Sequence, residues 1–174
     1  MTADESAAPP NFEGIIEVLN RLKVRYVVIG GVAAILQGVP LKRTLDLDVT
    51  PADDPKNQKR LMTAMKELGA KLRVVGQLEP VKIRLDERTL SKMTTMTFVT
   101  KFGPLDVCLR PDGTTGYDDL IRDAEILEIG GLSFHVSSLA DVERSKRAAG
   151  REKDAEHLRI LVEFRRRAEK RRRG

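Results

Sequence analysis

The chain has 174 residues, of which 41% are hydrophobic and 33% charged, and this composition fits one globular domain with a sizeable core. No apolar run approaches the roughly 18 residues of a membrane helix, and no signal-peptide pattern opens the sequence, so we expect a cytoplasmic protein without a membrane partner. The single cysteine, Cys108, excludes intrachain disulfides, and the two histidines, His135 and His157, disfavour a histidine-rich zinc site, so any metal site should consist mostly of carboxylates.

The net charge of +5 is concentrated at the C-terminal end. Residues 165–174 contain seven Lys or Arg and one Glu, so the rest of the chain carries 24 basic and 25 acidic side chains and is nearly neutral. A basic segment of this kind can hold RNA or DNA through phosphate contacts without reading the base sequence. It also fits a solvated helix end, and the sequence leaves both interpretations open.

The first part of the chain predicts a helix, a buried strand and a second helix. Residues 1–10 are small and acidic and contain proline, and we expect them to be disordered. Asn11 can cap a helix that continues to about residue 22, because apolar residues recur there at helical spacing. The continuous apolar run over residues 24–29 predicts a strand with both faces buried. We expect residues 32–36 to form the beginning of the next helix.

Two carboxylates one residue apart lie on the next predicted strand, residues 44–50. Because side chains alternate across a strand, Asp46 and Asp48 should share one face, with Cβ atoms about 6–7 Å apart, while Leu45, Leu47 and Val49 should face the core. Two carboxylates on a buried strand are costly unless a positive charge neutralises them, and Mg²⁺ does so. An exposed polar face would show the same spacing, so the metal site is a hypothesis.

A glycine pair, Gly30-Gly31, stands between the first strand and the helix that follows it. Glycines allow the backbone to approach a phosphate closely at the start of a helix, although the same pair is common in ordinary turns. A phosphate site and a carboxylate metal site joined by one short helix, with Arg43 between them, favour phosphoryl or nucleotidyl transfer.

The middle of the chain adds a third carboxylate. We expect an amphipathic helix over residues 55–68 and a hairpin with strands 94–100 and 105–109, while residues 70–93 give no clear pattern. Asp106 shares one face of the last strand with Cys108, which we interpret as a small packed residue. If this strand lies beside the strand of Asp48, Asp106 becomes a third metal ligand; otherwise it is an ordinary strand residue.

The C-terminal part predicts a short helix over residues 117–124, a hairpin over residues 126–136 and two final helices. Ser138 can cap the helix that runs to Ala149, with Asp141 as a capping-box variant, and Gly150 should end it. The last helix is expected over residues 151–167. Between the two helices, Lys146, Arg151 and Lys153 form a cationic corner that can meet a triphosphate or an RNA backbone, or can simply be solvated.

These motifs, in this order, resemble the DNA polymerase β-like nucleotidyltransferase superfamily. The resemblance covers roughly residues 24–160 and rests on Gly30-Gly31, the segment Arg43-Thr44-Leu45-Asp46-Leu47-Asp48 and the lone strand residue Asp106. The segment from Ser145 to Asp154 resembles the AbiEii/MenT-like toxin branch. A serine is common in the superfamily where this chain has Gly31.

The resemblance implies an α/β (α+β) fold, with a mixed sheet flanked by helices, two Mg²⁺ ions (or Mn²⁺) and an NTP donor. Asp46, Asp48 and Asp106 would ligate the metal, and Asp106 would also take the proton from the attacking hydroxyl. Gly30 and Gly31 would cradle phosphates with Arg43 and Thr44. Lys146, with Arg151 and Lys153, would neutralise the triphosphate, and Asp154 would be a further required residue whose role the resemblance leaves open.

We expect a nucleotidyltransferase core over residues 11–137, a helical part of the same domain over 138–167 and a basic tail over 168–174. The main hypothesis is a nucleotidyltransferase toxin of a toxin–antitoxin pair that modifies the 3′ end of tRNA, with an antitoxin protein as partner. The alternatives are nucleotide transfer to a protein or to a small molecule such as an aminoglycoside, and a non-catalytic NTP- or RNA-binding protein of the same fold.

Overall fold

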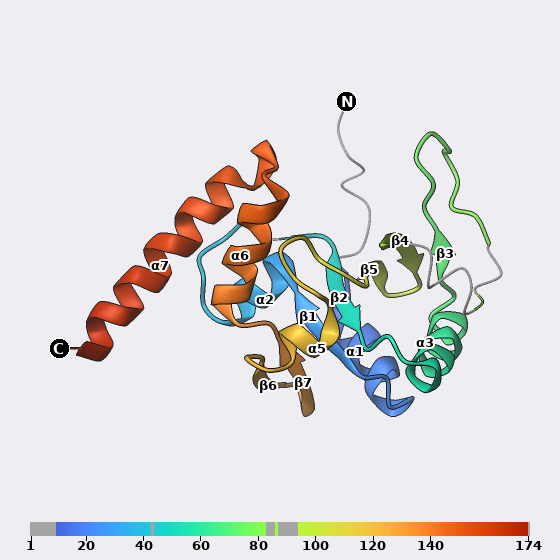
Figure 1. Cartoon of the computed structure of the whole chain (residues 1–174). Helices are drawn as coiled ribbons and strands as arrows, with labels where there is room; N and C mark the ends of the chain where they lie inside the picture. The colour runs from blue at the N-terminus through green and yellow to red at the C-terminus, as the bar shows by residue number, and fades with distance from the viewer. Residues whose placement is uncertain (1–9, 43, 83–85, 87–93, 174) are drawn as a thin grey trace.

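The computed structural model describes residues 10–42, 44–82, 86 and 94–173 (Figure 1). Residues 1–9, predicted to be disordered, and residues 83–85 and 87–93, within the segment that gives no clear sequence pattern, lie outside the described residues. The helices of the described part are α1 (Phe12–Arg21), α2 (Gly30–Leu36), α3 (Pro55–Glu67), α5 (Tyr117–Leu120), α6 (Leu139–Ala149), the 3₁₀ helix η1 (Glu152–Asp154) and α7 (Ala155–Arg173). The strands are β1 (Tyr26–Ile29), β2 (Leu47–Pro51), β3 (Lys71–Leu72), β4 (Thr95–Thr100), β5 (Gly103–Cys108), β6 (Glu125–Ile129) and β7 (Leu132–Val136).

The strands of the described residues form one mixed sheet in the order β3-β4-β5-β2-β1-β7-β6. The central strand β2 is antiparallel to β1 and parallel to β5, and β1 is parallel to β7. The hairpins β4–β5 and β6–β7 are antiparallel. The predicted mixed sheet with flanking helices is therefore confirmed, and so are both predicted hairpins.

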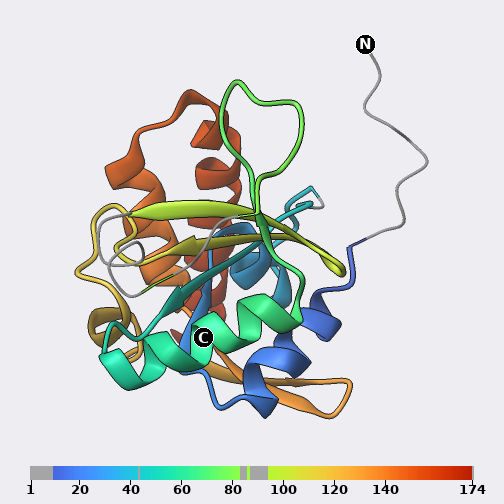
Figure 2. The same cartoon turned by 90° about the vertical axis from the view of Figure 1, so that its right-hand side faces the viewer.

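Helices cover the two faces of the sheet in separate groups. Helices α1 and α3 contact one another on one face, whereas α2 packs against α6, and α6 against α7, on the other (Figures 1 and 2). Fully buried side chains such as Ile15, Leu47 and Phe98 fill the core between these layers. Among the described residues, no helix combines the length and the apolar character needed to cross a membrane.

Several predicted boundaries are confirmed by their capping groups. The side chain of Asn11 accepts a hydrogen bond from Gly14 N at the start of α1, over 3.0 Å. Ser138 Oγ accepts from Asp141 N over 3.1 Å at the start of α6, and Gly150 ends that helix in the left-handed conformation. These caps position α6 and the corner that follows it, which is where the cationic side chains lie.

The prediction for the strand of Asp46 and Asp48 is wrong at its start. Strand β2 begins at Leu47, not at Thr44, because its pairing with β5 begins at Leu47 and its pairing with β1 reaches only Asp48. Without a paired neighbour, the alternation of side chains does not extend further back. Leu45, expected in the core, is 63% exposed, and Asp46 lies just outside the strand.

Other differences concern element length. Helix α5 ends at Leu120, well before the predicted end near Ala124. Within residues 70–93, for which the sequence gives no clear pattern, the described residues form the two-residue strand β3, and Val75 is fully exposed. The last helix was expected over residues 151–167, but residues 152–154 form a 3₁₀ turn and α7 continues to Arg173. Most of the segment expected as a tail is therefore a continuation of the helix.

Candidate active site

A pocket of about 590 Å³ lies between the sheet and α6, within the size range of small-ligand sites. Ten of the eleven predicted site residues line it: Gly30, Gly31, Thr44, Asp46, Asp48, Asp106, Lys146, Arg151, Lys153 and Asp154. The remaining one, Arg43, lies outside the described residues. Residues separated by more than a hundred positions in the sequence thus meet at one site.

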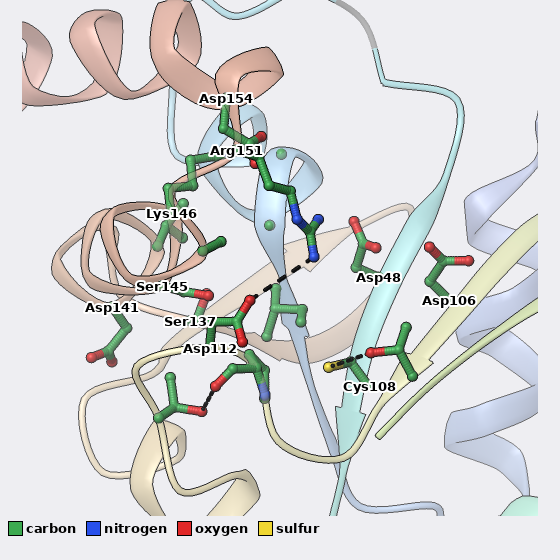
Figure 3. Close-up of a pocket in the computed structure, with 18 of the residues that line it drawn as sticks. Asp48, Asp106, Cys108, Asp112, Ser137, Asp141, Ser145, Lys146, Arg151 and Asp154 are labelled. Atoms are coloured by element: carbon green, nitrogen blue, oxygen red, sulfur yellow. Dashed lines mark hydrogen bonds and ion pairs between the residues drawn. The ribbon is translucent and has the colours of Figure 1, made fainter. Parts of the chain in front are cut away.

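Asp48 and Asp106 lie directly opposite each other on neighbouring strands. Strand β5 runs parallel beside β2, with Asp48 paired to Asp106 in the register. Neighbouring strands are about 4.8 Å apart, and residues paired in this way present their side chains on the same face. Figure 3 shows both carboxylates side by side at the edge of the pocket. The condition set for Asp106, that its strand lie beside that of Asp48, is met.

The electrostatics of this pair disfavour two negative charges. Burial, followed by the charges of Asp106 and Asp46, raises the pKa of Asp48 to about 7, against the lowering influence of Lys146 and Arg151. Burial also raises the pKa of Asp106, although a hydrogen bond from Thr97 opposes the shift. Oδ1 of Asp106 is buried and has no hydrogen-bond partner. Both carboxylates are therefore poised to gain from a bound cation.

These features fit a divalent cation held jointly by protein and substrate. Within the described residues, no three His, Cys, Asp or Glu side chains already form a complete metal site. Mg²⁺, however, is usually bound by one or two carboxylates together with substrate phosphates and water. Asp48 and Asp106, with the unpartnered oxygen of Asp106, match this kind of site, and Asp46 lines the same pocket.

The glycine pair packs tightly against the carboxylate strand. Gly30 has a φ of +68°, and a Cβ atom there would lie 2.9 Å from Oδ2 of Asp48. A Cβ atom on Gly31 would lie 2.5 Å from Cγ2 of Thr44. Only glycine fits both positions without displacement, so the turn brings bare backbone to the pocket beside Asp48.

The cationic corner is built around a mostly buried ion pair. Lys146 Nζ donates a hydrogen bond to Asp154 Oδ1 over 2.9 Å, and the two side chains are only 12% and 17% exposed. Burial alone would raise the pKa of Asp154, but the hydrogen bond and charge of Lys146, with Arg151 and Lys153, lower it overall. Asp154 thus holds Lys146 in place across from Asp48 (Figure 3), and the alternative of a merely solvated corner does not apply to this pair.

The rim formed by the loop that follows β5 was not predicted from the sequence. The predicted residue Arg151 reaches toward Asp112 of this loop, 4.0 Å away (Figure 3). Arg110 and Thr114 of the same loop line the pocket, and so does Ser137 on the α6 side. Cys108, expected only as a packed residue, lines it too and accepts a hydrogen bond from Thr95. Apart from Arg151, none of these residues belongs to a local motif, so only the three-dimensional arrangement shows them.

A salt-bridge cluster connects the loop after β5 to α6. Arg144 of α6 donates hydrogen bonds to Asp141 over 2.8 Å and to Asp119 over 3.1 Å. Asp119 also accepts from Thr115 N over 3.0 Å, which ties the loop after β5 to α6. The loop and the helix therefore form one connected wall of the pocket.

Comparisons with known proteins show the family through a sequence profile and the fold through solved structures. The sequence profile of the family described as aminoglycoside-2''-adenylyltransferase matches residues 12–155. The fold is similar to that of the lincosamide antibiotic adenylyltransferase LnuA (TM-score 0.57, 14% identity, 87% of this chain and 94% of that one). It is also similar to the fold of ANT(2'')-Ia bound to adenylyl-2''-tobramycin, with a TM-score of 0.51 and 15% identity over 94% of this chain and 97% of that one. A nucleotidyltransferase-fold protein from Thermotoga maritima has a TM-score of 0.54 and 21% identity over 88% of this chain and 91% of that one. No curated sequence is similar enough to count as a relative.

Proposed function

The chain belongs to the aminoglycoside-2''-adenylyltransferase family of nucleotidyltransferases, and on this premise we propose that it transfers a nucleotide from an NTP, preferably ATP, to a hydroxyl group of a small aminoglycoside-like acceptor. The observation that carries the proposal is the register that places Asp48 beside Asp106 in a pocket with the glycine turn and Lys146. Carboxylates for a metal and cations for a triphosphate are the two requirements of nucleotidyl transfer.

In the proposed reaction, the acceptor oxygen forms a bond to the α-phosphorus, the bond from that phosphorus to the β-phosphate bridging oxygen breaks, and pyrophosphate leaves. Asp48, Asp106 and Asp46 would hold Mg²⁺, which when bound supplies charge neutralisation at the phosphates. Asp106 would accept the proton of the acceptor hydroxyl, because it lies beside Asp48 in the pocket. Gly30 and Gly31 would approach the phosphates.

The choice of a small acceptor rests on the matched family and not on the charge of the pocket. The described lining contains six aspartates and four Lys or Arg residues. Asp141 is paired with Arg144, Lys146 with Asp154, and Arg151 lies near Asp112. Asp46, Asp48 and Asp106 are the carboxylates assigned to the metal, and the family match favours an aminoglycoside-like acceptor.

A second candidate acceptor is the 3′ end of tRNA, and the basic helix α7 is the observation that favours it. Neither the matched family nor the structures compared above is described as a toxin or as a tRNA-modifying enzyme, so the small molecule takes precedence over the toxin–antitoxin interpretation. The intact Asp46, Asp48 and Asp106 argue against a non-catalytic binding protein.

The test is a transfer assay with the purified protein, Mg²⁺ and each NTP labelled at the α-phosphate, offered separately to a panel of aminoglycosides and to total tRNA. We expect label on an aminoglycoside from one NTP, and none with the Asp48→Ala variant. Label on tRNA alone would replace the proposal by the second candidate. Metal-dependent NTP binding without label on either would redirect the search to protein acceptors.

A further inference from the structure

We propose that Ser137 is a phosphate-binding residue of this site, donating its hydroxyl to an anionic oxygen of the triphosphate; the proposal rests on the function proposed above. Ser137 is 1% exposed, lines the pocket, and its Oγ has no hydrogen-bond partner. A buried hydroxyl without a partner is unfavourable, so the fold tolerates a penalty that a ligand in the pocket can relieve.

The backbone holds Ser137 rigidly beside the glycine turn. Val28 of β1 is paired in parallel with Val136 of β7, and Ser137 N donates to Val28 O over 2.8 Å. Ser137 therefore follows the end of β7 where Gly30 follows the end of β1. The carbonyl of Ser137 accepts from Gln37 Nε2 of the segment after α2, over 2.9 Å. Both backbone groups are satisfied, and only the side-chain oxygen remains free to bind a ligand.

The surroundings select an anion as that ligand. Ser137 lies on the α6 side of the pocket with Ser145 and Lys146, across from Asp48 and Asp106 (Figure 3). The glycine backbone and Lys146 line the same pocket, where a hydroxyl can donate to a phosphate oxygen, and hydrogen bonds to charged groups are the stronger kind. Gly31 carries no side chain that could supply such a donor, whereas Ser137, directly after β7, carries one.

The chain offers a matched control. Among the described residues, three buried side-chain polar atoms lack a partner: Thr50 Oγ1, Asp106 Oδ1 and Ser137 Oγ. Thr50 is fully buried in β2 but does not line the pocket. Thr50→Val therefore removes an unpartnered hydroxyl away from the pocket, whereas Ser137→Ala removes one from a residue that lines it.

The experiment is calorimetric titration of the wild-type, Ser137→Ala and Thr50→Val proteins, with Mg²⁺, against a non-hydrolysable ATP analogue, inorganic tripolyphosphate and adenosine. We expect Ser137→Ala to weaken both triphosphate ligands about tenfold or more and to leave adenosine binding unchanged, because a hydrogen bond to a charged group is worth about 1.5–3 kcal/mol. Thr50→Val should bind all three ligands as the wild type does.

The outcomes separate this inference from the proposed function. Wild-type affinity in Ser137→Ala, while the wild type binds the analogue, would overturn the role of Ser137 and leave the function standing. No binding by the wild type would overturn both. An equal loss of adenosine binding, or an equal loss in Thr50→Val, would show a general structural effect and overturn the inference. If Ser137→Ala does not fold, Ser137→Cys, with its weaker donor, must show the same selective loss.

Discussion

Asp48 is the residue with the largest electrostatic cost in the site. Its pKa is raised to about 7, first by burial and then by the neighbouring carboxylates. A raised pKa means that the native protein binds a proton more tightly than the unfolded chain, so the stability that protonation provides is present at low pH and is lost as the pH rises toward 7. Without metal, Asp48 should therefore destabilise the fold at neutral pH.

We predict that Asp48→Asn is more stable than the wild type in EDTA at pH 8, by an amount on the order of a few kcal/mol, and that the difference shrinks between pH 7 and pH 5. Urea unfolding across this range measures it. Added Mg²⁺ should stabilise the wild type more than the variant. Asp123→Asn, at an exposed carboxylate, is the control; a wild type as stable as Asp48→Asn at pH 8 would contradict the burial argument.

A second prediction concerns the lack of space for a side chain at Gly31. A methyl group there would meet Cγ2 of Thr44 at 2.5 Å, and overpacking of this kind costs about 1–3 kcal/mol. We expect Gly31→Ala to lower kcat/KM for the NTP by about tenfold, measured in the transfer assay.

The double variant Gly31→Ala/Thr44→Ser is the matched control, because serine keeps the hydroxyl but removes the clashing methyl group. Activity should largely return in the double variant. Full activity in Gly31→Ala alone would mean that the turn does not need bare backbone.

The sequence identified site residues that belong to motifs and missed those that do not. Asp46, Asp48 and Asp106 were found because carboxylates in apolar strands are unusual, and all three line the pocket. Ser137 and Asp112 are ordinary residues in connecting segments. Their place in the site follows from the pairing of β1 with β7 and from the loop after β5, and such contacts between distant segments have no local signature.

At the scale of elements, the sequence predicted helices and hairpins well because caps and turns are local. The parallel pairing of β2 with β5 could only be stated as a condition, since register depends on strands far apart in the sequence. The start of β2 was wrong for the same reason: alternation around Leu45 continues in the sequence, but the pairing stops at Leu47. Helix α7 was predicted too short because its charged half lacks an apolar stripe.

The corner between α6 and η1 depends on one glycine. Gly150 has a φ of +58° and would meet no atom with an added Cβ, so a side chain there costs only the backbone strain of the left-handed conformation, about 1–2 kcal/mol. Gly69, after α3, has a φ of +62° and equally open space. The two glycines are structurally equivalent, but only Gly150 precedes site residues.

We therefore predict that Gly150→Ala and Gly69→Ala lose similar stability in thermal unfolding, about 1 kcal/mol each, while only Gly150→Ala also loses transfer activity. The reason is that a shift of this corner moves Arg151 and Lys153, which line the pocket. Equal activity of the two variants at a temperature where both are folded would show that the corner does not position the cations.

At the scale of the whole molecule, α7 divides into an anchored half and a free half. Leu161 is fully buried, and Arg165 pairs with Glu143 of α6. Beyond this point the helix extends away from the body of the protein (Figure 1). Lys170, Arg171, Arg172 and Arg173 are exposed, and none has an ion-pair partner within the described residues. The free half thus contributes charge but little packing.

We predict that deletion of residues 168–174 leaves folding and transfer to a small acceptor unchanged but weakens binding to tRNA. The deletion removes four basic residues and one acidic residue, so the net charge falls from +5 to +2. Affinity for tRNA, measured by fluorescence anisotropy across a salt series, should decrease and depend less steeply on salt, because fewer phosphates are neutralised.

Transfer to a small acceptor should be unaffected while tRNA binding weakens, because the pocket is anchored through α6 and the first half of α7, which the deletion spares. A deletion that abolished transfer to aminoglycosides while preserving thermal stability would instead make the basic helix part of the acceptor site.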